Sequence, residues 1–134
     1  MKIYDCFMYF DEDLVLEIRL NTLNKIVDKF VICEATRDHS GNKKSLKFQI
    51  EKFQNFKDKI EHIIVEDIPI NVRKRKRDWH ENHIRDQYQR NAIIRGLKNC
   101  DPKDWIMISD IDEIPDPKRI AEFDTRKKYA CFLQ

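Results

Sequence analysis

Short, almost uninterrupted apolar runs recur along the chain, and more polar segments separate them. A continuous apolar run of this length is typical of a strand that is buried on both faces of a sheet. Four such runs span residues 3–10, 29–35, 60–65 and 105–109. We therefore expect each of them to form a buried β-strand.

The segments between these runs carry apolar residues at helical spacing. Residues 11–23 open with three acidic residues, which favour a helix N-terminus, and residues 81–97 predict the longest helix. Residues 46–56 predict an amphipathic helix and residues 118–123 a short one. The alternation of strands and helices predicts an α/β fold with a mostly parallel sheet flanked by helices.

The last part of the sequence predicts a fifth strand over residues 128–133, which has only just begun when the sequence ends. With 134 residues the chain has the length of one modest domain. We therefore expect a single domain over residues 1–134 that lacks a C-terminal, acceptor-binding part.

Charged residues are numerous but nearly balanced, because 26 lysines and arginines face 24 aspartates and glutamates, for a net charge of +2. This balance argues against a dedicated nucleic-acid-binding protein, whose basic face usually shows in its net charge. The run RKRKR at residues 73–77 is the strongest basic cluster. We interpret it either as a solvated loop or as a basic loop that closes over a diphosphate.

No segment has the pattern of a signal peptide or approaches the roughly 18 apolar residues of a membrane span. We therefore expect a cytoplasmic protein without a membrane span. The cysteines, Cys6, Cys33, Cys100 and Cys131, are widely spaced. In a reducing compartment this spacing favours buried free thiols over a disulfide framework or a zinc site.

The segment SDIDEIPDP, which follows the fourth run, places acidic residues where a strand ends. In open α/β sheets, ligands bind at the carboxyl ends of the strands. If the backbone stays extended, Asp110 and Asp112 point to the same side and can converge on one Mg²⁺ or Mn²⁺ ion, which also binds phosphate oxygens. Ile111 between them would anchor the segment. The alternative is a solvated turn and helix cap.

Four segments, taken together and in order, resemble glycosyltransferase family 17. They are IYDCFMYFDEDLVLEIRLNTL at 3–23, VDKFVICEATRDHSGNKKSLKF at 27–48, RDQYQRNAI at 85–93 and WIMISDIDEIPDP at 105–117. The resemblance implies a GT-A type, Rossmann-like fold that binds a nucleotide sugar. It also implies a metal-dependent sugar transfer with inversion, from UDP-N-acetylglucosamine to a glycan or other hydroxyl acceptor.

The resemblance also implies roles for individual residues. Asp110 and Asp112 match the acidic metal motif, in which Asp112 would be the more direct ligand and Asp110 would approach the ribose or a metal-bound water. Glu34, at the end of the second run, matches an acidic position that contacts the nucleoside. The alternative for Glu34 is a strand-end acid that forms a salt bridge with Arg37.

Arg90 lies within the third of these segments. Because a helix turns by about 100° per residue, Arg85 and Arg90 lie about 140° apart and do not share a face. We expect Arg90 to reach the diphosphate or the acidic segment, and Arg85 to stay in solvent.

No acidic residue of the chain is a convincing general base, so we expect the base of an inverting transfer to lie beyond Gln134. The alternative function is therefore a truncated or degenerate domain that binds a nucleotide sugar or a partner without turnover. A sheet that lacks part of its strands could also pair its edge with a second copy, so a homo-oligomer is a further hypothesis.

Overall fold

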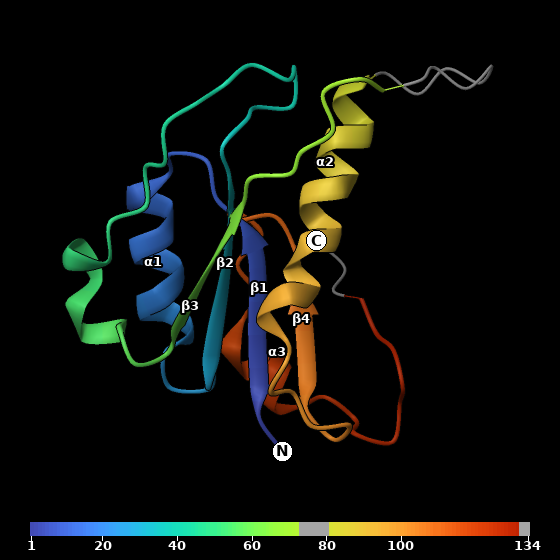
Figure 1. Ribbon diagram of the computed structural model, residues 1–134. Coiled ribbons are helices and arrows are strands. Elements are labelled where there is room, and N and C mark those ends of the chain that lie inside the picture. Colours follow the sequence, from blue (N-terminus) through green and yellow to red (C-terminus); the bar gives the residue numbers. More distant parts are fainter. Residues whose placement is uncertain (73–80, 132–134) are drawn as a thin grey trace.

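A four-stranded parallel sheet forms the centre of the computed structural model, which describes residues 1–72 and 81–131 (Figure 1). The strand order is β3-β2-β1-β4. Cys6 of β1 lies opposite Val31 of β2 on one side and Ile108 of β4 on the other. The strands are β1 (Ile3–Met8), β2 (Lys29–Ala35), β3 (Ile60–Val65) and β4 (Trp105–Ile108). The predicted α/β fold with a parallel sheet is therefore confirmed.

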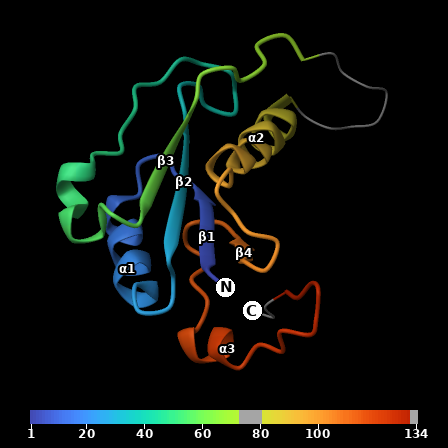
Figure 2. The same cartoon turned by 60° about the horizontal axis from the view of Figure 1, so that its bottom comes forward.

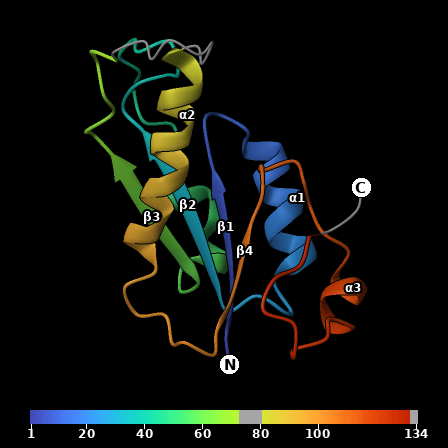
Figure 3. The same cartoon turned by 90° about the vertical axis from the view of Figure 1, so that its right-hand side faces the viewer.

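Helices cover both faces of the sheet (Figures 2 and 3). One face packs against α1 (Asp13–Leu23) and the 3₁₀ helix η1 (Ile50–Phe56). The opposite face packs against α2 (Glu81–Asn91) and the 3₁₀ helix η2 (Ala92–Gly96).

Side chains of β1 alternate between these two faces, as the pleat of a strand requires. Ile3 and Phe7 pack in the core beneath α1, whereas Tyr4 and Cys6 join the core beneath α2. The same alternation gives β2 its continuous burial, because both of its neighbours in the sheet and both helical layers cover it. This explains why the second run of the sequence is apolar almost throughout.

Several predicted elements differ in extent or type. The first strand ends at Met8, and the long helix is α-helical only to Asn91 before it tightens into η2. The amphipathic helix predicted over residues 46–56 is wrong, because only η1 is helical and Phe53 within it has a non-helical backbone. Its buried residues, Phe53 and Phe56, are three apart, which suits the period of a 3₁₀ helix.

The predicted fifth strand does not form over residues 128–131, while residues 132 and 133 lie outside the described part of the chain. Residues 128–131 are exposed, and Tyr129 keeps 81% of its surface in solvent. Because a strand needs a neighbouring strand to satisfy its backbone groups, an apolar pattern alone is not sufficient here. The short helix that precedes this segment is α3 (Pro117–Ala121).

Two of the cysteines are buried free thiols, as predicted, namely Cys6 and Cys33. Burial raises the pKa of Cys33 to about 12, so its thiol stays protonated at neutral pH. Cys100 and Cys131 are free thiols too, but Cys100 is only partly buried and Cys131 is exposed, so the predicted burial is wrong for these two. Within the described residues, none of the helices has the length and apolar character needed to cross a bilayer.

Candidate functional site

The acidic segment forms a tight turn at the carboxyl end of β4. The Glu113 N–H donates to the Asp110 carbonyl (3.1 Å), and the Ile114 N–H donates to the Asp112 carbonyl (3.0 Å). The extended backbone on which the convergence of Asp110 and Asp112 depends is therefore absent here, because these hydrogen bonds fold the backbone back on itself, and the alternative of a solvated turn describes this backbone. Ile111 is buried in the core beneath α1 and anchors the turn as predicted. We call residues 110–113 the acidic turn.

A buried arginine, Arg19 of α1, holds the acidic turn from within. Its guanidinium is completely buried and forms a two-pronged ion pair with Asp5 of β1, at 2.8 and 2.7 Å. Its remaining N–H groups donate to Ser109 Oγ (2.7 Å) and to the carbonyls of Asp110 (2.7 Å), Ile111 (3.0 Å) and Glu113 (3.2 Å).

Neither Arg19 nor Asp5 was identified from the sequence, although two signals were present. Asp5 interrupts an apolar strand, and a fully buried carboxylate normally has a cationic partner. Arg19 lies on the face of α1 that also carries Leu16, Leu20 and Leu23, all of which are buried. A charge on the apolar face of a helix opposite a charge in a buried strand predicts an ion pair.

Arg90 of α2 reaches the acidic turn, as expected. Its guanidinium nitrogen Nη2 lies 2.7 Å from Asp110 Oδ1, and the two side chains are 36% and 53% exposed. The hydrogen bond to Asp110 holds the pKa of Arg90 above its ordinary value. The acidic turn therefore contacts two arginines, Arg19 from the helical layer of α1 and Arg90 from the helical layer of α2.

Arg85 is buried, so the expectation that it stays in solvent is wrong. Its guanidinium donates to the carbonyls of Pro69 (3.0 Å), His39 (3.1 Å) and Ile70 (2.9 Å). These carbonyls belong to two different loops near the carboxyl ends of the strands, and a guanidinium can satisfy several acceptors at once. Arg85 therefore ties the two loops to α2.

Glu34, at the end of β2, is fully buried and has several donors around it. It accepts hydrogen bonds from the backbone N–H groups of Lys47 (2.5 Å) and Phe48 (3.3 Å) and from the Lys44 ammonium (3.3 Å). His62 Nε2 lies 3.1 Å away. Burial alone would raise the pKa of Glu34, but the hydrogen bonds from His62, Lys47 and Phe48 and the charge of Lys44 together outweigh it and hold the pKa below its usual value.

The alternative partner considered for Glu34, Arg37, does not contact it in the described structure. The Arg37 guanidinium instead donates to the Gly41 carbonyl (2.9 Å), within the same loop. The alternative is therefore right that Glu34 is a strand-end acid in a salt bridge and wrong about the partner, which is Lys44. The predicted nucleoside contact at Glu34 stays a prediction, and it would require residues 44–48 to move away from the carboxylate.

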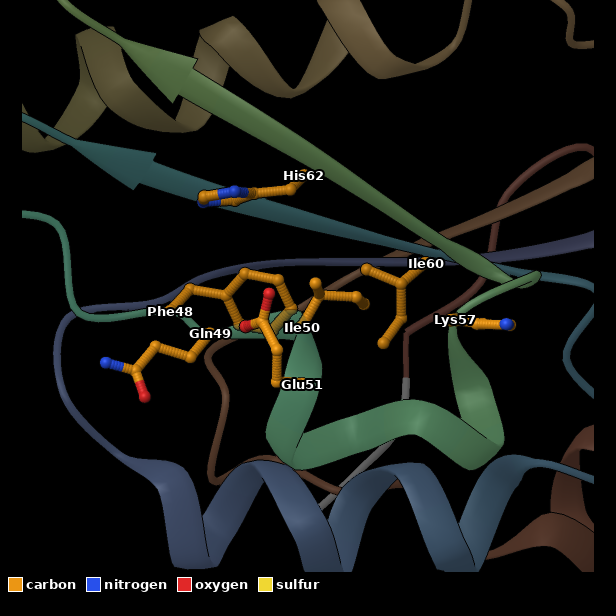
Figure 4. Close-up of a pocket in the computed structure, with 7 residues that line it drawn as sticks. All are labelled: Phe48, Gln49, Ile50, Glu51, Lys57, Ile60 and His62. Carbon is orange, nitrogen blue, oxygen red and sulfur yellow. The ribbon is translucent and has the colours of Figure 1, made fainter.

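A pocket of about 380 Å³ opens beside this region, between η1 and β3 (Figure 4). The His62 ring projects from β3 over Phe48, with 4.6 Å between the ring centroids. Because β3 and β4 are the two edge strands, the pocket and the acidic turn lie at opposite edges of the sheet. The lining residues are Phe48, Gln49, Ile50, Glu51, Lys57, Ile60 and His62.

The acidic turn offers a small set of oxygen donors for a cation. Asp112 and Asp110 are exposed, whereas Glu113 Oε2 accepts a hydrogen bond from the Asp110 N–H (2.9 Å). Over residues 1–72 and 81–131, no group of three or more His, Cys, Asp or Glu side chains could hold a metal ion. Mg²⁺ commonly takes only one or two carboxylates together with substrate phosphates, so two exposed aspartates are a suitable donor set.

The basic run at residues 73–77 lies outside the described residues.

A parallel sheet with helices on both faces and an acidic turn at the carboxyl end of one strand places the chain among Rossmann-like α/β domains. The sequence model of glycosyltransferase family 17 matches residues 1–130, and the chain therefore belongs to this family.

Curated relatives carry the name β-1,4-mannosyl-glycoprotein 4-β-N-acetylglucosaminyltransferase. Those of Homo sapiens, Rattus norvegicus and Mus musculus are each 28% identical to this chain over 109 residues. The matches cover 75% of this chain and 19% of each relative, so the chain spans about a fifth of their length. No solved structure matches the chain.

Proposed function

We propose that this domain binds UDP-N-acetylglucosamine with Mn²⁺ or Mg²⁺ and contributes the donor site of an inverting N-acetylglucosaminyltransferase. The acceptor would be a glycan or another hydroxyl compound. Membership of glycosyltransferase family 17 and the names of the relatives support the transferase class and the sugar. The arrangement of Asp110, Asp112 and Arg90 supports the position of the donor.

The observation that carries this proposal is the acidic turn, because it combines exposed carboxylates with a partly exposed arginine. Asp112 and Asp110 would hold the cation. A bound cation would neutralise the negative charge that develops on the leaving diphosphate. Arg90 has a guanidinium at the same place, and guanidinium groups bind phosphate oxygens through paired hydrogen bonds. The acidic turn would therefore offer a diphosphate two binding partners, the cation held by the carboxylates and the Arg90 guanidinium.

Arg90 and a cation would share Asp110. In the structure, the Arg90 guanidinium balances the charge of this carboxylate. When a cation with its diphosphate binds at the turn, the Arg90 side chain is free to turn toward the phosphate, because it is partly exposed and long. We therefore expect donor and cation to bind together rather than one after the other.

The test is a calorimetric titration of UDP and UDP-N-acetylglucosamine into this chain, in the presence of Mn²⁺ and in the presence of chelator. We expect binding that requires Mn²⁺ and that Asp112→Ala abolishes. Asp58→Ala, which removes an exposed aspartate at the opposite end of the sheet, is the matched control and should bind like the unchanged chain. Binding that is insensitive to chelator or to Asp112→Ala would contradict the proposal.

Turnover separates the proposed enzyme from the alternative of a nucleotide-sugar-binding domain without activity. Release of UDP from UDP-N-acetylglucosamine in the presence of a glycan acceptor would support the enzyme. Metal-dependent UDP binding without any transfer would support the binding domain. Pairing of the sheet edge with a second copy remains a prediction that sedimentation at high concentration can test.

A further inference from the structure

We propose that Arg19, held by Asp5, is the positioning residue of the donor site, because it fixes the acidic turn in the form that presents its carboxylates. This inference rests on the function proposed above. Arg19 does not reach the solvent, so it would act through the turn and not on the ligand itself.

The argument begins with the direction of the backbone in the turn. The carbonyls of Asp110, Ile111 and Glu113 all accept hydrogen bonds from Nη1 of Arg19. These oxygens are therefore directed into the protein and are occupied. The carboxylates of the turn, by contrast, belong to residues that are exposed to solvent, Asp110 and Asp112 among them.

The position of Arg19 is itself fixed from both sides. Asp5 of β1 takes the Nε and Nη2 groups, and the Phe7 ring lies 4.6 Å from the guanidinium carbon. Asp5 belongs to a central strand, and its backbone pairs with Phe30 on one side and Met107 on the other. The orientation of the guanidinium, and with it that of the turn, is thus tied to the centre of the sheet.

A lysine at position 19 would keep the charge but not this arrangement. An ammonium group is a single point donor, whereas the planar guanidinium spans two groups of acceptors at once. A lysine that pairs with Asp5 would therefore release the turn carbonyls. Residues that orient metal ligands from behind typically change metal affinity by about tenfold to about a hundredfold when they are replaced.

The experiment compares Arg19→Lys with Arg95→Lys by titration of UDP, with Mn²⁺ and with chelator. Arg95 is the matched control because it also holds an aspartate, Asp67, with two hydrogen bonds of 2.8 Å, but lies on η2, away from the turn. We expect Arg19→Lys to lower the Mn²⁺-dependent affinity for UDP by about tenfold. A purely structural role would instead lower the fraction of the protein that binds UDP and leave the affinity of that fraction unchanged. Arg95→Lys should stay within about twofold of the unchanged chain.

Hydrogen exchange supplies a second readout that does not depend on UDP. The amides of Glu113 and Ile114 close the turn, and we expect them to exchange faster in Arg19→Lys than in the unchanged chain. If Arg19→Lys does not fold, Ser109→Ala replaces it, since Ser109 Oγ accepts a hydrogen bond from Arg19 at the base of the turn.

The outcomes separate this inference from the proposed function. A folded variant with unchanged UDP affinity and unchanged exchange at the turn would overturn the positioning role of Arg19. If the unchanged chain does not bind UDP with Mn²⁺, the proposed function fails, and exchange at the turn then decides alone whether Arg19 positions it.

Discussion

Asp110 and Glu34 both lie at the carboxyl end of a strand of the same sheet, and both were predicted to bind the donor, yet the structure gives them opposite surroundings. The Asp110 side chain is 53% exposed and pairs with Arg90. Glu34 is completely buried and accepts hydrogen bonds from the backbone that covers it. The position at the carboxyl end of a strand therefore does not by itself leave a carboxylate open to a ligand. Asp110 and Glu34 differ in how many of their carboxylate lone pairs are already used by hydrogen bonds within the protein.

The difference arises from the segments that follow each strand. After β2 the chain runs through a long loop that returns over the strand end, so that Lys47 and Phe48 donate to Glu34. After β4 the chain turns at once, and Arg19 holds that turn by its carbonyls. Glu34 thus stabilises a loop, whereas the acidic turn is held by Arg19 at its carbonyls and by Glu113 at the Asp110 N–H.

The largest expected effect on stability comes from Glu34→Ala. The substitution leaves the backbone N–H groups of Lys47 and Phe48 without their acceptor and the Lys44 ammonium without its buried partner. We expect the free energy of unfolding, measured with urea, to fall by about 3 kcal/mol. Glu61→Ala, an exposed glutamate on β3, should change it by less than about 0.5 kcal/mol. An equal effect of the two would contradict a closing role for Glu34.

A smaller effect is expected from Gly41→Ala, in the loop that follows β2. Gly41 has a φ of 91°, and an added Cβ would lie 2.9 Å from the guanidinium carbon of Arg85. Arg85 cannot easily give way, because it is buried and bonded to three carbonyls. We expect a loss of about 1 to 2 kcal/mol in thermal or urea unfolding, against little change for Ser40→Ala. A fully stable Gly41→Ala variant would show that this loop is not held in the observed form.

The pH dependence of stability offers a finer comparison of the unchanged chain with Glu34→Gln. The folded-state pKa of Glu34 lies below its ordinary value of 4.5, so the folded state binds its proton less readily than the unfolded state. The stabilisation from the charged carboxylate is then complete above about pH 5 and is lost as the pH falls through the folded-state pKa. We expect the difference in unfolding free energy between the two proteins to shrink as the pH is lowered from 7 to about 3. A difference that stays constant over this range would show that the charge of Glu34 contributes nothing.

The smallest effect on stability is expected from Asp110→Asn. It weakens an ion pair whose partners are both partly exposed, and such pairs contribute less than about 1 kcal/mol. Urea unfolding of Asp110→Asn should therefore nearly coincide with that of the unchanged chain. A loss as large as that of Glu34→Ala would mean that Asp110 is a structural carboxylate too.

The fold could be predicted from the sequence because its evidence is local. Each strand of a covered parallel sheet is a continuous apolar run, and the long helices between the runs show their own periodicity. The acidic turn was found for the same reason, since it directly follows such a run. The strand predicted over residues 128–133 failed because a local pattern does not show whether a neighbouring strand is present.

The supporting contacts of the site could not be predicted in the same way. Arg19 and the Asp110 carbonyl are 91 residues apart in the sequence, and Glu34 and Phe48 belong to a strand and a loop with no shared periodicity. Pairings of this kind depend on how the loops return across the sheet. The most a sequence can offer is a charge in an apolar setting, as at Asp5 and Arg19, which indicates that a partner must exist.

The central claim is that the donor site lies at Asp110 and not at Glu34, and one titration tests it most directly. UDP is titrated with Mn²⁺ into Asp110→Asn and Glu34→Gln, each first shown to be folded. We expect Asp110→Asn to weaken UDP binding by about tenfold or more and Glu34→Gln to stay within about twofold of the unchanged chain. The reverse result, in which Glu34→Gln loses UDP binding and Asp110→Asn keeps it, would contradict the claim and place the nucleotide beside β2.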